Sequence, residues 1–163
     1  MAAKAKKKKV REIDEKLELS KIIEKIFELL GIDTAFEVRE DKKQEALMVD
    51  IQTDESAGLI IGNRGRNLNA IQTIAGIIFR NKIGDWKRII VDVGKWREKE
   101  ENRLKELASK TAERVKETSE SQPIYNLSPA QRRIVHLALS EEGDVKTESV
   151  GEDEERYLVV SIK

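Results

Sequence analysis

The chain has 163 residues, and its 31 Lys and Arg residues balance 31 Asp and Glu residues, so its formal net charge is zero. It contains no cysteine, which excludes disulfide bonds, thiolate zinc sites and cysteine nucleophiles. No apolar run approaches the roughly 18 residues of a membrane span, so we expect a cytoplasmic protein without membrane insertion. The length suits one domain or two small ones.

Charge is distributed unevenly along the chain. Residues 1–15 open with a lysine-rich stretch and are predicted to form a disordered basic tail, because they offer too little apolar surface to offset the entropy of ordering. This tail either tethers nucleic acid or only improves solubility, and both interpretations stay open. Acidic residues gather elsewhere, at 98–106 and 141–155. Zero net charge is therefore compatible with a local nucleic-acid-binding surface.

The segment 16–94 is predicted to fold in the order α-β-β-α-α-β. Its predicted elements are helices at about 20–30, 55–61 and 66–82 and strands at about 34–40, 46–52 and 86–93. The apolar stripe of the first helix includes Leu29 and Leu30, and Gly31 stands where a C-terminal cap is expected. Trp86, at the start of the third strand, is interpreted as structural. A three-stranded sheet covered on one side by the helices would bury the apolar faces together.

A GxxG loop connects the second and third of these helices, with Asn63 and Arg64 between Gly62 and Gly65. Two glycines let the backbone turn tightly and approach a partner, because no Cβ stands in the way. Loops of this form clamp the sugar-phosphate backbone of a single strand in KH domains. The ionisable residues at 58–82 are all basic. This setting favours RNA contact over the alternative, a plain helix–helix turn.

The candidate RNA-binding residues of this segment follow from that interpretation. They are Ile61, Gly62, Asn63, Arg64, Gly65 and Arg66. The loop amides and the N-terminus of the following helix would receive phosphates, aided by the two arginines. Bases would lie along a groove lined by apolar residues such as Ile60, Ile61 and Leu68. Because only 4% of the residues are aromatic, we expect aliphatic packing and edge hydrogen bonds in place of aromatic stacking.

The segment 95–163 is predicted to be a second, small α/β domain with a three-stranded sheet. Its predicted elements are helices at about 95–117 and 128–139 and strands at about 123–127, 144–150 and 156–162. The second helix has a strong start, with Ser128 as the cap, Pro129 at the first helical position and Gln131 completing a capping box.

One face of that second helix is cationic. Arg132 and His136 are four residues apart, so they lie about 40° apart around the axis, and Arg133 falls on the same side. Arg matches phosphate with a planar donor fork, and His can donate a hydrogen bond or stack on a base. We expect all three residues to contact nucleic acid; the alternative is a solvated helix face. Ile134 and Ala138 are predicted to face the core, with Val135 at the border.

The acidic turn at 152–155 is interpreted as a solvated hairpin tip. It would repel RNA, so the binding face is expected to point away from it.

The stretch from Arg132 to His136 fits the RxxxH signature of a small single-stranded nucleic-acid-binding domain. Residues 127–163 resemble the C-terminal domain of the Jag (SpoIIIJ-associated) family of bacteria, in which an RxxxH domain follows directly on a KH domain. The resemblance covers about 20–163 and is most specific in IIGNRGRNLNAIQ, VDVGKWREKEENRLKELA and TESVGEDEER. The α-β-β-α-α-β order is that of a type II KH domain, which supports it independently. Many members carry a further N-terminal domain and a long linker, which this chain is expected to lack.

The residues and the resemblance together imply an α+β protein, a type II KH domain at 16–94 followed by an RxxxH domain at 95–163. The implied function is binding of single-stranded RNA, or single-stranded DNA, in a bacterial post-transcriptional, cell-envelope or cell-division regulator. No phosphate-binding GxxxxGK[ST] loop, His pair or thiol is present, so we expect no enzyme, no cofactor and no metal. The alternative is a protein–protein adaptor, in which the KH unit pairs with another KH protein without contacting RNA.

Overall fold

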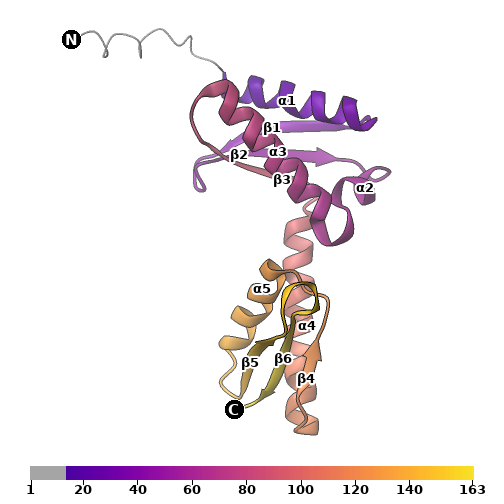
Figure 1. Ribbon diagram of the computed structural model, residues 1–163, viewed down its shortest axis with the longest axis vertical. Coiled ribbons are helices and arrows are strands. Elements are labelled where there is room, and N and C mark those ends of the chain that lie inside the picture. The colour runs from indigo at the N-terminus through magenta and orange to yellow at the C-terminus, as the bar shows by residue number, and fades with distance from the viewer. Residues whose placement is uncertain (1–13) are drawn as a thin grey trace, which may run out of the picture. The chain divides into compact units, whose positions relative to one another are not determined.

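The computed structural model describes residues 14–163, apart from the side chain of Glu154. Most of the predicted basic tail therefore lies outside the described residues, whereas Asp14 and Glu15 belong to the first helix. The chain divides into two compact units, Met1–Lys95 and Trp96–Lys163. Both units combine helices with a three-stranded sheet, which confirms the predicted α+β fold (Figure 1).

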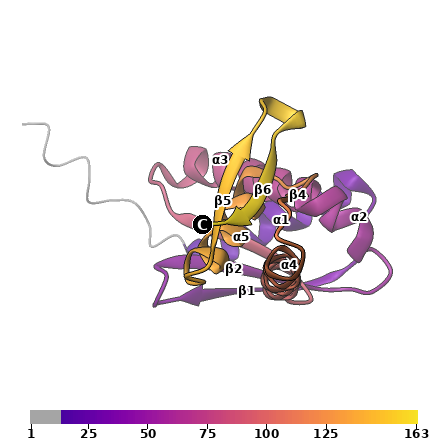
Figure 2. The ribbon, with the colours of Figure 1, turned by 90° about the horizontal axis from the view of Figure 1, so that it is seen from below.

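The first unit has the predicted α-β-β-α-α-β order. Its elements are α1 (Glu15–Leu30), β1 (Ala35–Asp41), β2 (Ala46–Gln52), α2 (Ala57–Ile61), a single 3-10 turn η1 (Asn63–Gly65), α3 (Arg66–Ile83) and β3 (Arg88–Val93). The strands are ordered β1-β2-β3, with β1 antiparallel and β3 parallel to β2. A parallel pair needs a long crossover, which α2 and α3 supply here. Helices α1 and α3 lie on the same side of the sheet (Figure 1, Figure 2).

The core of this unit lies between that sheet and the two long helices. Alternate residues of β2 and β3 are buried in matching register, with Leu47 opposite Ile89 and Val49 opposite Val91. The helices add large side chains that are almost fully buried: Leu19, Ile23, Phe27, Leu68 and Phe79. This alternation on the strands meeting an apolar stripe on each helix is what the sequence predicted.

Two expectations for the first unit are wrong. Leu29 and Leu30 are exposed, because Leu29 lies about 90° from the centre of the buried face of α1 and Leu30 is the last helical residue. Strand β3 begins at Arg88, two residues later than expected, and 69% of the surface of Trp86 is exposed. Trp86 is therefore not a core residue.

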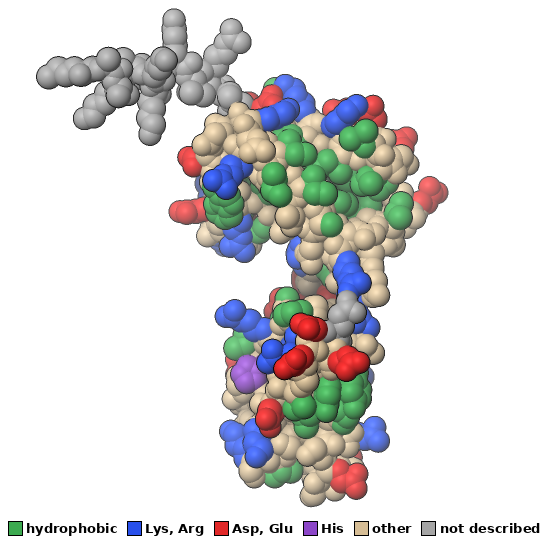
Figure 3. Space-filling view, in the orientation of Figure 1, with side chains coloured by type: hydrophobic (Ala, Val, Ile, Leu, Met, Phe, Trp, Pro, Cys, Tyr) green, Lys and Arg blue, Asp and Glu red, His purple; other side chains and the backbone are tan. Residues whose placement is uncertain are grey.

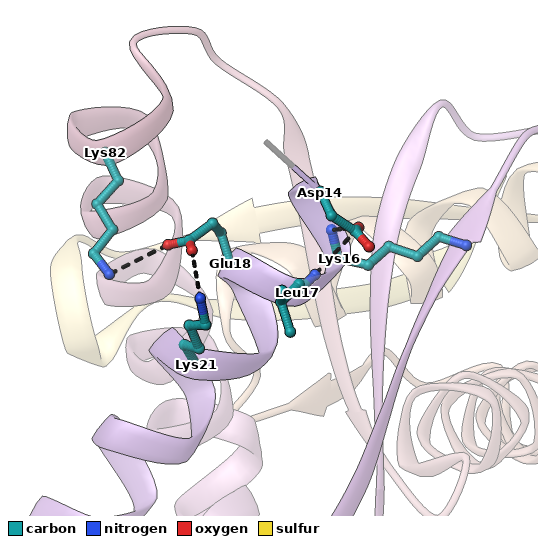
Figure 4. A network of polar contacts seen from close by, with 6 residues as sticks. All are labelled: Asp14, Lys16, Leu17, Glu18, Lys21 and Lys82. Atoms are coloured by element: carbon teal, nitrogen blue, oxygen red, sulfur yellow. Dashed lines mark hydrogen bonds and ion pairs between the residues drawn. The ribbon is translucent and has the colours of Figure 1, made fainter. Parts of the chain in front are cut away.

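Helix α1 begins five residues earlier than expected, because Asp14 caps it. The Asp14 carboxylate accepts hydrogen bonds from the backbone amides of Lys16 (3.1 Å) and Leu17 (3.3 Å), two of the amides that a helix start leaves unpaired (Figure 4). One turn later, Glu18 bonds Lys21 at 2.9 Å and reaches Lys82 of α3 at 3.5 Å. The hydrogen bond from Lys21 and the nearby Lys82 charge lower the pKa of Glu18.

The second unit packs two helices on one face of its sheet. Its elements are α4 (Trp96–Thr118), β4 (Gln122–Ile124), α5 (Pro129–Ser140), β5 (Val145–Val150), a 3-10 turn η2 (Asp153–Glu155) and β6 (Tyr157–Ile162). The strands are ordered β4-β6-β5, and both pairs are antiparallel. The core residues are Leu104, Ala108, Ala112, Val115, Ile124, Leu127, Val135, Leu139, Val145, Leu158 and Val160. This is the predicted three-stranded sheet.

Helix α5 buries a different face from the one expected. Gln131, Val135 and Leu139 form the most buried line, so Val135 is at the centre of the face, whereas Ile134 and Ala138 are half-buried. The reason is Gln131. Its Oε1 accepts the amide hydrogen of Ser128 in the capping box, and its Nε2 donates to Glu100 of α4 at 2.7 Å. These bonds satisfy a buried polar side chain, as burial requires.

No helix in residues 14–163 combines the length and the apolar character needed to cross a lipid bilayer.

The Asp14 cap generates a stability prediction. Asp14→Ala should lower the free energy of unfolding by about 1 kcal/mol, because two amides at the start of α1 lose their acceptor. Chemical denaturation followed by circular dichroism measures it. Lys16→Ala is the control, since Lys16 contributes only its backbone amide to the cap. Equal stability of the two variants would show that the helix does not depend on this cap.

Candidate nucleic-acid interface

The GxxG loop has a backbone that turns through three left-handed residues. Gly62 has φ 67°, Arg64 has φ 55° and Gly65 has φ 78°. At Gly62, a Cβ would lie 2.5 Å from Cγ of Asn67, and the Asn67 side chain is held because its Nδ2 donates to the carbonyl of Leu59 at 2.8 Å. Glycine is therefore required at position 62 both by the dihedral angle and by the neighbouring side chain. The Asn67 bond joins the end of α2 to the start of α3.

Internal hydrogen bonds use part of the loop's amides. The amide of Gly62 donates to Gly58 at 2.9 Å, that of Gly65 donates to Gly62 at 3.5 Å, and that of Arg66 donates to the carbonyl of Asn63. These bonds stabilise the turn. The loop's contribution to anion binding is therefore narrower than the whole set of amides expected from the sequence.

The predicted site residues of this loop differ in exposure. Asn63, Arg64 and Arg66 are exposed, Ile61 and Gly62 are half-buried and Gly65 is buried. Ile60 and Leu68, which were expected to line a groove, are fully buried and belong to the core. Of the apolar residues named for the groove, only Ile61 is partly accessible. The expectation for the other two is wrong, because they face the sheet.

The surroundings of the loop are basic. Residues 56–84 include no Asp or Glu, and the first turn of α3 contains no acidic residue. The N-terminus of an 18-residue helix carries a partial positive charge, which favours an anion there. Arg64 and Arg66 lie at that terminus. The arrangement can accept a phosphate at the start of α3.

The second unit has a cavity of about 360 Å³ between α5 and the β5–β6 hairpin. It is lined by Pro129, Arg132, Arg133, His136, Thr147, Ser149, Arg156 and Leu158. The fold thus brings the three residues predicted from the RxxxH helix together around one hollow. Three arginines and a histidine supply donors and positive charge, while Thr147 and Ser149 supply hydroxyl groups.

Arg132 is anchored to the backbone. Its Nη1 donates to the carbonyl of Leu127 at 2.7 Å and to the carbonyl of Arg156 at 3.0 Å. Arg132 therefore ties the loop before α5 to the start of β6, and it is half-buried, whereas Arg133 is exposed. The two neighbouring arginines, which the sequence presented as alike, have different surroundings.

His136 is held in place by the sheet. Its Nδ1 forms a hydrogen bond with Oγ1 of Thr147 on β5, which leaves Nε2 as the ring nitrogen for a ligand. Thr147 pairs with Val160 and Ser149 pairs with Leu158 in the β5–β6 register, so these hydroxyls lie on the helix-facing side of the sheet.

Sequence reasoning missed Arg156, Thr147 and Ser149. The alternation of β5 was a signal for the two hydroxyl residues, and Arg156 stands inside the TESVGEDEER segment. The expectation that the acidic turn points away from the binding face is wrong. Residues 153–155 directly precede Arg156, whose carbonyl contacts Arg132 and whose residue lines the cavity, so the turn lies beside it.

An aromatic pair was also missed. The rings of Tyr125 and Tyr157 lie 4.8 Å apart at 39°, and 57% of the surface of Tyr125 is exposed. Tyr157 follows Arg156, and Tyr125 precedes Leu127 by two residues, so the Arg132 anchor joins the two segments that carry the rings.

Comparison with known proteins identifies both units. A family model described as the KhpA/KhpB KH domain matches residues 20–93, and a model of the RxxxH domain matches residues 102–161. The second domain is named for an arginine and a histidine with three residues between them, which are Arg132 and His136 here. The two matches follow one another along the chain, as the resemblance to the Jag family implied.

Several bacterial relatives match most of the chain. The RNA-binding protein KhpB of Bacillus subtilis is 33% identical over 158 residues, which are 96% of this chain and 74% of that protein. The protein of the same name from Clostridium symbiosum is 28% identical over 141 residues, 86% of this chain and 63% of that protein. That from Lactiplantibacillus plantarum is 32% identical over 106 residues, 65% of this chain and 33% of that protein.

This chain thus spans about two thirds to three quarters of the first two relatives and a third of the last. The order of the two matched domains, the GxxG loop between α2 and α3 and the RxxxH helix agree with these relatives. The chain therefore belongs to the KhpB family, the Jag family of proteins with a KH domain followed by an RxxxH domain.

Proposed function

We propose that this chain binds single-stranded RNA through both units, residues 16–94 and 95–163, and catalyses no reaction. The observation that carries the proposal is the GxxG loop. Its left-handed turn is held by Asn67 and presents exposed Asn63 and Arg64 at the N-terminus of α3. The printed name of the relatives, RNA-binding protein, supports the same conclusion. Binding of RNA implies the cytoplasm as the compartment.

In the first unit, phosphates would be received at the start of α3. Since Gly62, Gly65 and Arg66 use their amides within the turn, the amides of Asn63 and Arg64 and the helix N-terminus remain for the strand. Arg64 adds a guanidinium that matches the geometry of a phosphate. KH loops clamp about four nucleotides of backbone in this manner.

In the second unit, Arg133 and Arg156 would supply charge to phosphates and His136 would donate through Nε2. Arg132 would act mainly as a positioning residue, because its Nη1 holds the carbonyls of Leu127 and Arg156. Thr147 would fix the orientation of His136. Single-stranded DNA shares the phosphate chemistry and is the second ligand to compare.

The adaptor alternative is less well supported. The relatives are named for RNA binding, and the GxxG loop with its basic surroundings has a chemical reason to bind a phosphate backbone. Pairing with a second KH protein stays a secondary proposal, supported by a family model whose description covers KhpA as well as KhpB. A post-transcriptional, cell-envelope or cell-division role in bacteria is the setting that the family implies.

The first test replaces Asn63 and Arg64 by Asp in one variant. Affinity for single-stranded RNA should fall by about tenfold or more, equivalent to about 1.4 kcal/mol, because two carboxylates would stand where phosphates pass. Unfolding free energy should change by no more than about 0.5 kcal/mol, since both side chains are exposed. Fluorescence anisotropy with labelled RNA and thermal melting measure the two effects.

The chain offers a matched control. Asn102 and Arg103 form a second Asn-Arg pair, exposed on α4, so Asn102→Asp with Arg103→Asp makes the same change in charge away from the loop. Arg103 bonds Glu100 at 2.8 Å, so the melting temperature of the control must be recorded as well. Equal loss of affinity in both double variants would mean that only net charge matters and that the loop is not a clamp.

The second test uses the difference between Arg132 and Arg133. Arg132→Ala should lower the unfolding free energy by about 1–2 kcal/mol, because two carbonyls lose a charged donor. Arg133→Ala should leave stability unchanged and weaken RNA binding severalfold, as should His136→Ala. Chemical denaturation and RNA titration separate these effects. RNA affinity unaltered in both Arg133→Ala and His136→Ala would exclude the cavity as a binding site.

A further inference from the structure

A second cavity in the first unit lies beside α3, away from the GxxG loop. It has a volume of about 270 Å³ and is lined by Gln72, Thr73, Gly76, Ile77, Arg80, Trp86, Lys87 and Ile89. Its walls are one side of α3, the start of β3 and the linker between them. Nothing in the proposed function uses this cavity.

Trp86 is the most conspicuous residue of its lining. A tryptophan usually buries most of its ring, yet 69% of the surface of Trp86 is exposed, as is 56% of Ile77. The linker that carries Trp86 is short, and it is fixed at one end by Gly84, whose amide donates to Arg80 at 2.8 Å, and at the other by the start of β3. The position of the ring is thus set by ordered neighbours. Apolar side chains are exposed over the helices of this unit (Figure 3).

The cavity continues the face of α3 that begins at the loop. At 100° per residue, Arg66, Thr73, Ile77 and Arg80 fall within about 60° of one another around the axis. At about 1.5 Å per residue, Ile77 lies about 16 Å along the helix from Arg66. A strand that leaves the loop along this face therefore reaches the cavity after a few nucleotides.

The floor of the cavity is open because of Gly76. A Cβ built on Gly76 meets no atom within 4 Å, although the residue lies inside a helix, where glycine is unfavourable. A larger residue would fit the protein and would fill the cavity. The flat space above Gly76, with Trp86 and Ile77 beside it, suits a planar ring.

The charge around the cavity suits a polyanion. Arg80 is exposed at its rim, and Lys87 is ion-paired with Glu15 and with Glu40, so it neutralises two carboxylates. The hydrogen bond to Glu15 raises the pKa of Lys87, which keeps it charged. The Asp85 carboxylate accepts the backbone amide of Trp86 at 2.8 Å.

We propose that Trp86 stacks on a base of the RNA strand whose backbone the GxxG loop clamps, with Gly76 as the floor of the base pocket. This inference rests on the proposed function and adds an aromatic contact that the sequence did not predict. Base–aromatic stacking tolerates any base, because every base has a π-face, so the pocket would extend the bound strand without selecting a sequence.

The test uses the full chain with Trp96→Phe as the parent, so that Trp86 is its remaining tryptophan, and a ten-nucleotide single-stranded RNA of randomised sequence. Adding RNA should quench the fluorescence of Trp86. Trp86→Ala should weaken binding by about fivefold or more, the lower range of one base stack, whereas Trp86→Phe should retain most of the affinity. Gly76→Leu should weaken binding without lowering the melting temperature.

Leu29→Ala is the control, an exposed apolar residue of the same unit that lies outside this cavity, and its RNA affinity should equal that of the parent. A parent that binds RNA without a change in Trp86 fluorescence, and whose affinity survives Trp86→Ala, overturns this inference and leaves the proposed function intact. Self-association that depends on Trp86, with RNA affinity unaltered, overturns it in favour of a second copy. A parent that does not bind RNA overturns the proposed function and this inference together.

Discussion

The turn from α2 into α3 is the constraint on which the rest of the first unit depends. Gly62, Arg64 and Gly65 all have positive φ, and the Asn67 side chain fills the space where a Cβ on Gly62 would stand. The bond from Asn67 to Leu59 fixes the two helices to each other. With that angle fixed, α3 can return across the sheet and place β3 parallel to β2. The same geometry presents the N-terminus of α3 and an exposed Arg64 to solvent.

The second unit uses one arginine as scaffold and its neighbours as surface. Arg132 holds two backbone carbonyls, and these two segments carry Arg156 and the tyrosine pair. The RxxxH signature is therefore partly a structural signature. Its arginine shapes the cavity and its histidine is oriented by Thr147, while Arg133 and Arg156 provide charge at the surface. Both units share one logic, in which a local restraint on the backbone sets out donors for a phosphate chain.

Local signals predicted most of the fold, and long-range contacts account for what was missed. The order of elements, the Gly31 and Ser128 caps and the strand alternation all depend on residues close in sequence. The buried face of α5 depends on Gln131 reaching Glu100, which is 31 residues away. The cavity of the second unit depends on the β5–β6 register. Neither contact leaves a periodic pattern, so the helix face and Arg156 could not be predicted.

The central claim is that single-stranded RNA contacts the start of α3 and the α5 cavity directly. Backbone amide spectra of the ¹⁵N-labelled full chain, recorded by NMR during titration with single-stranded RNA, test it most directly. The account predicts the largest shift changes at residues 63–68, on Arg133 and His136, and around Arg156. Shift changes confined to other faces, with these amides unmoved at saturating RNA, would contradict it.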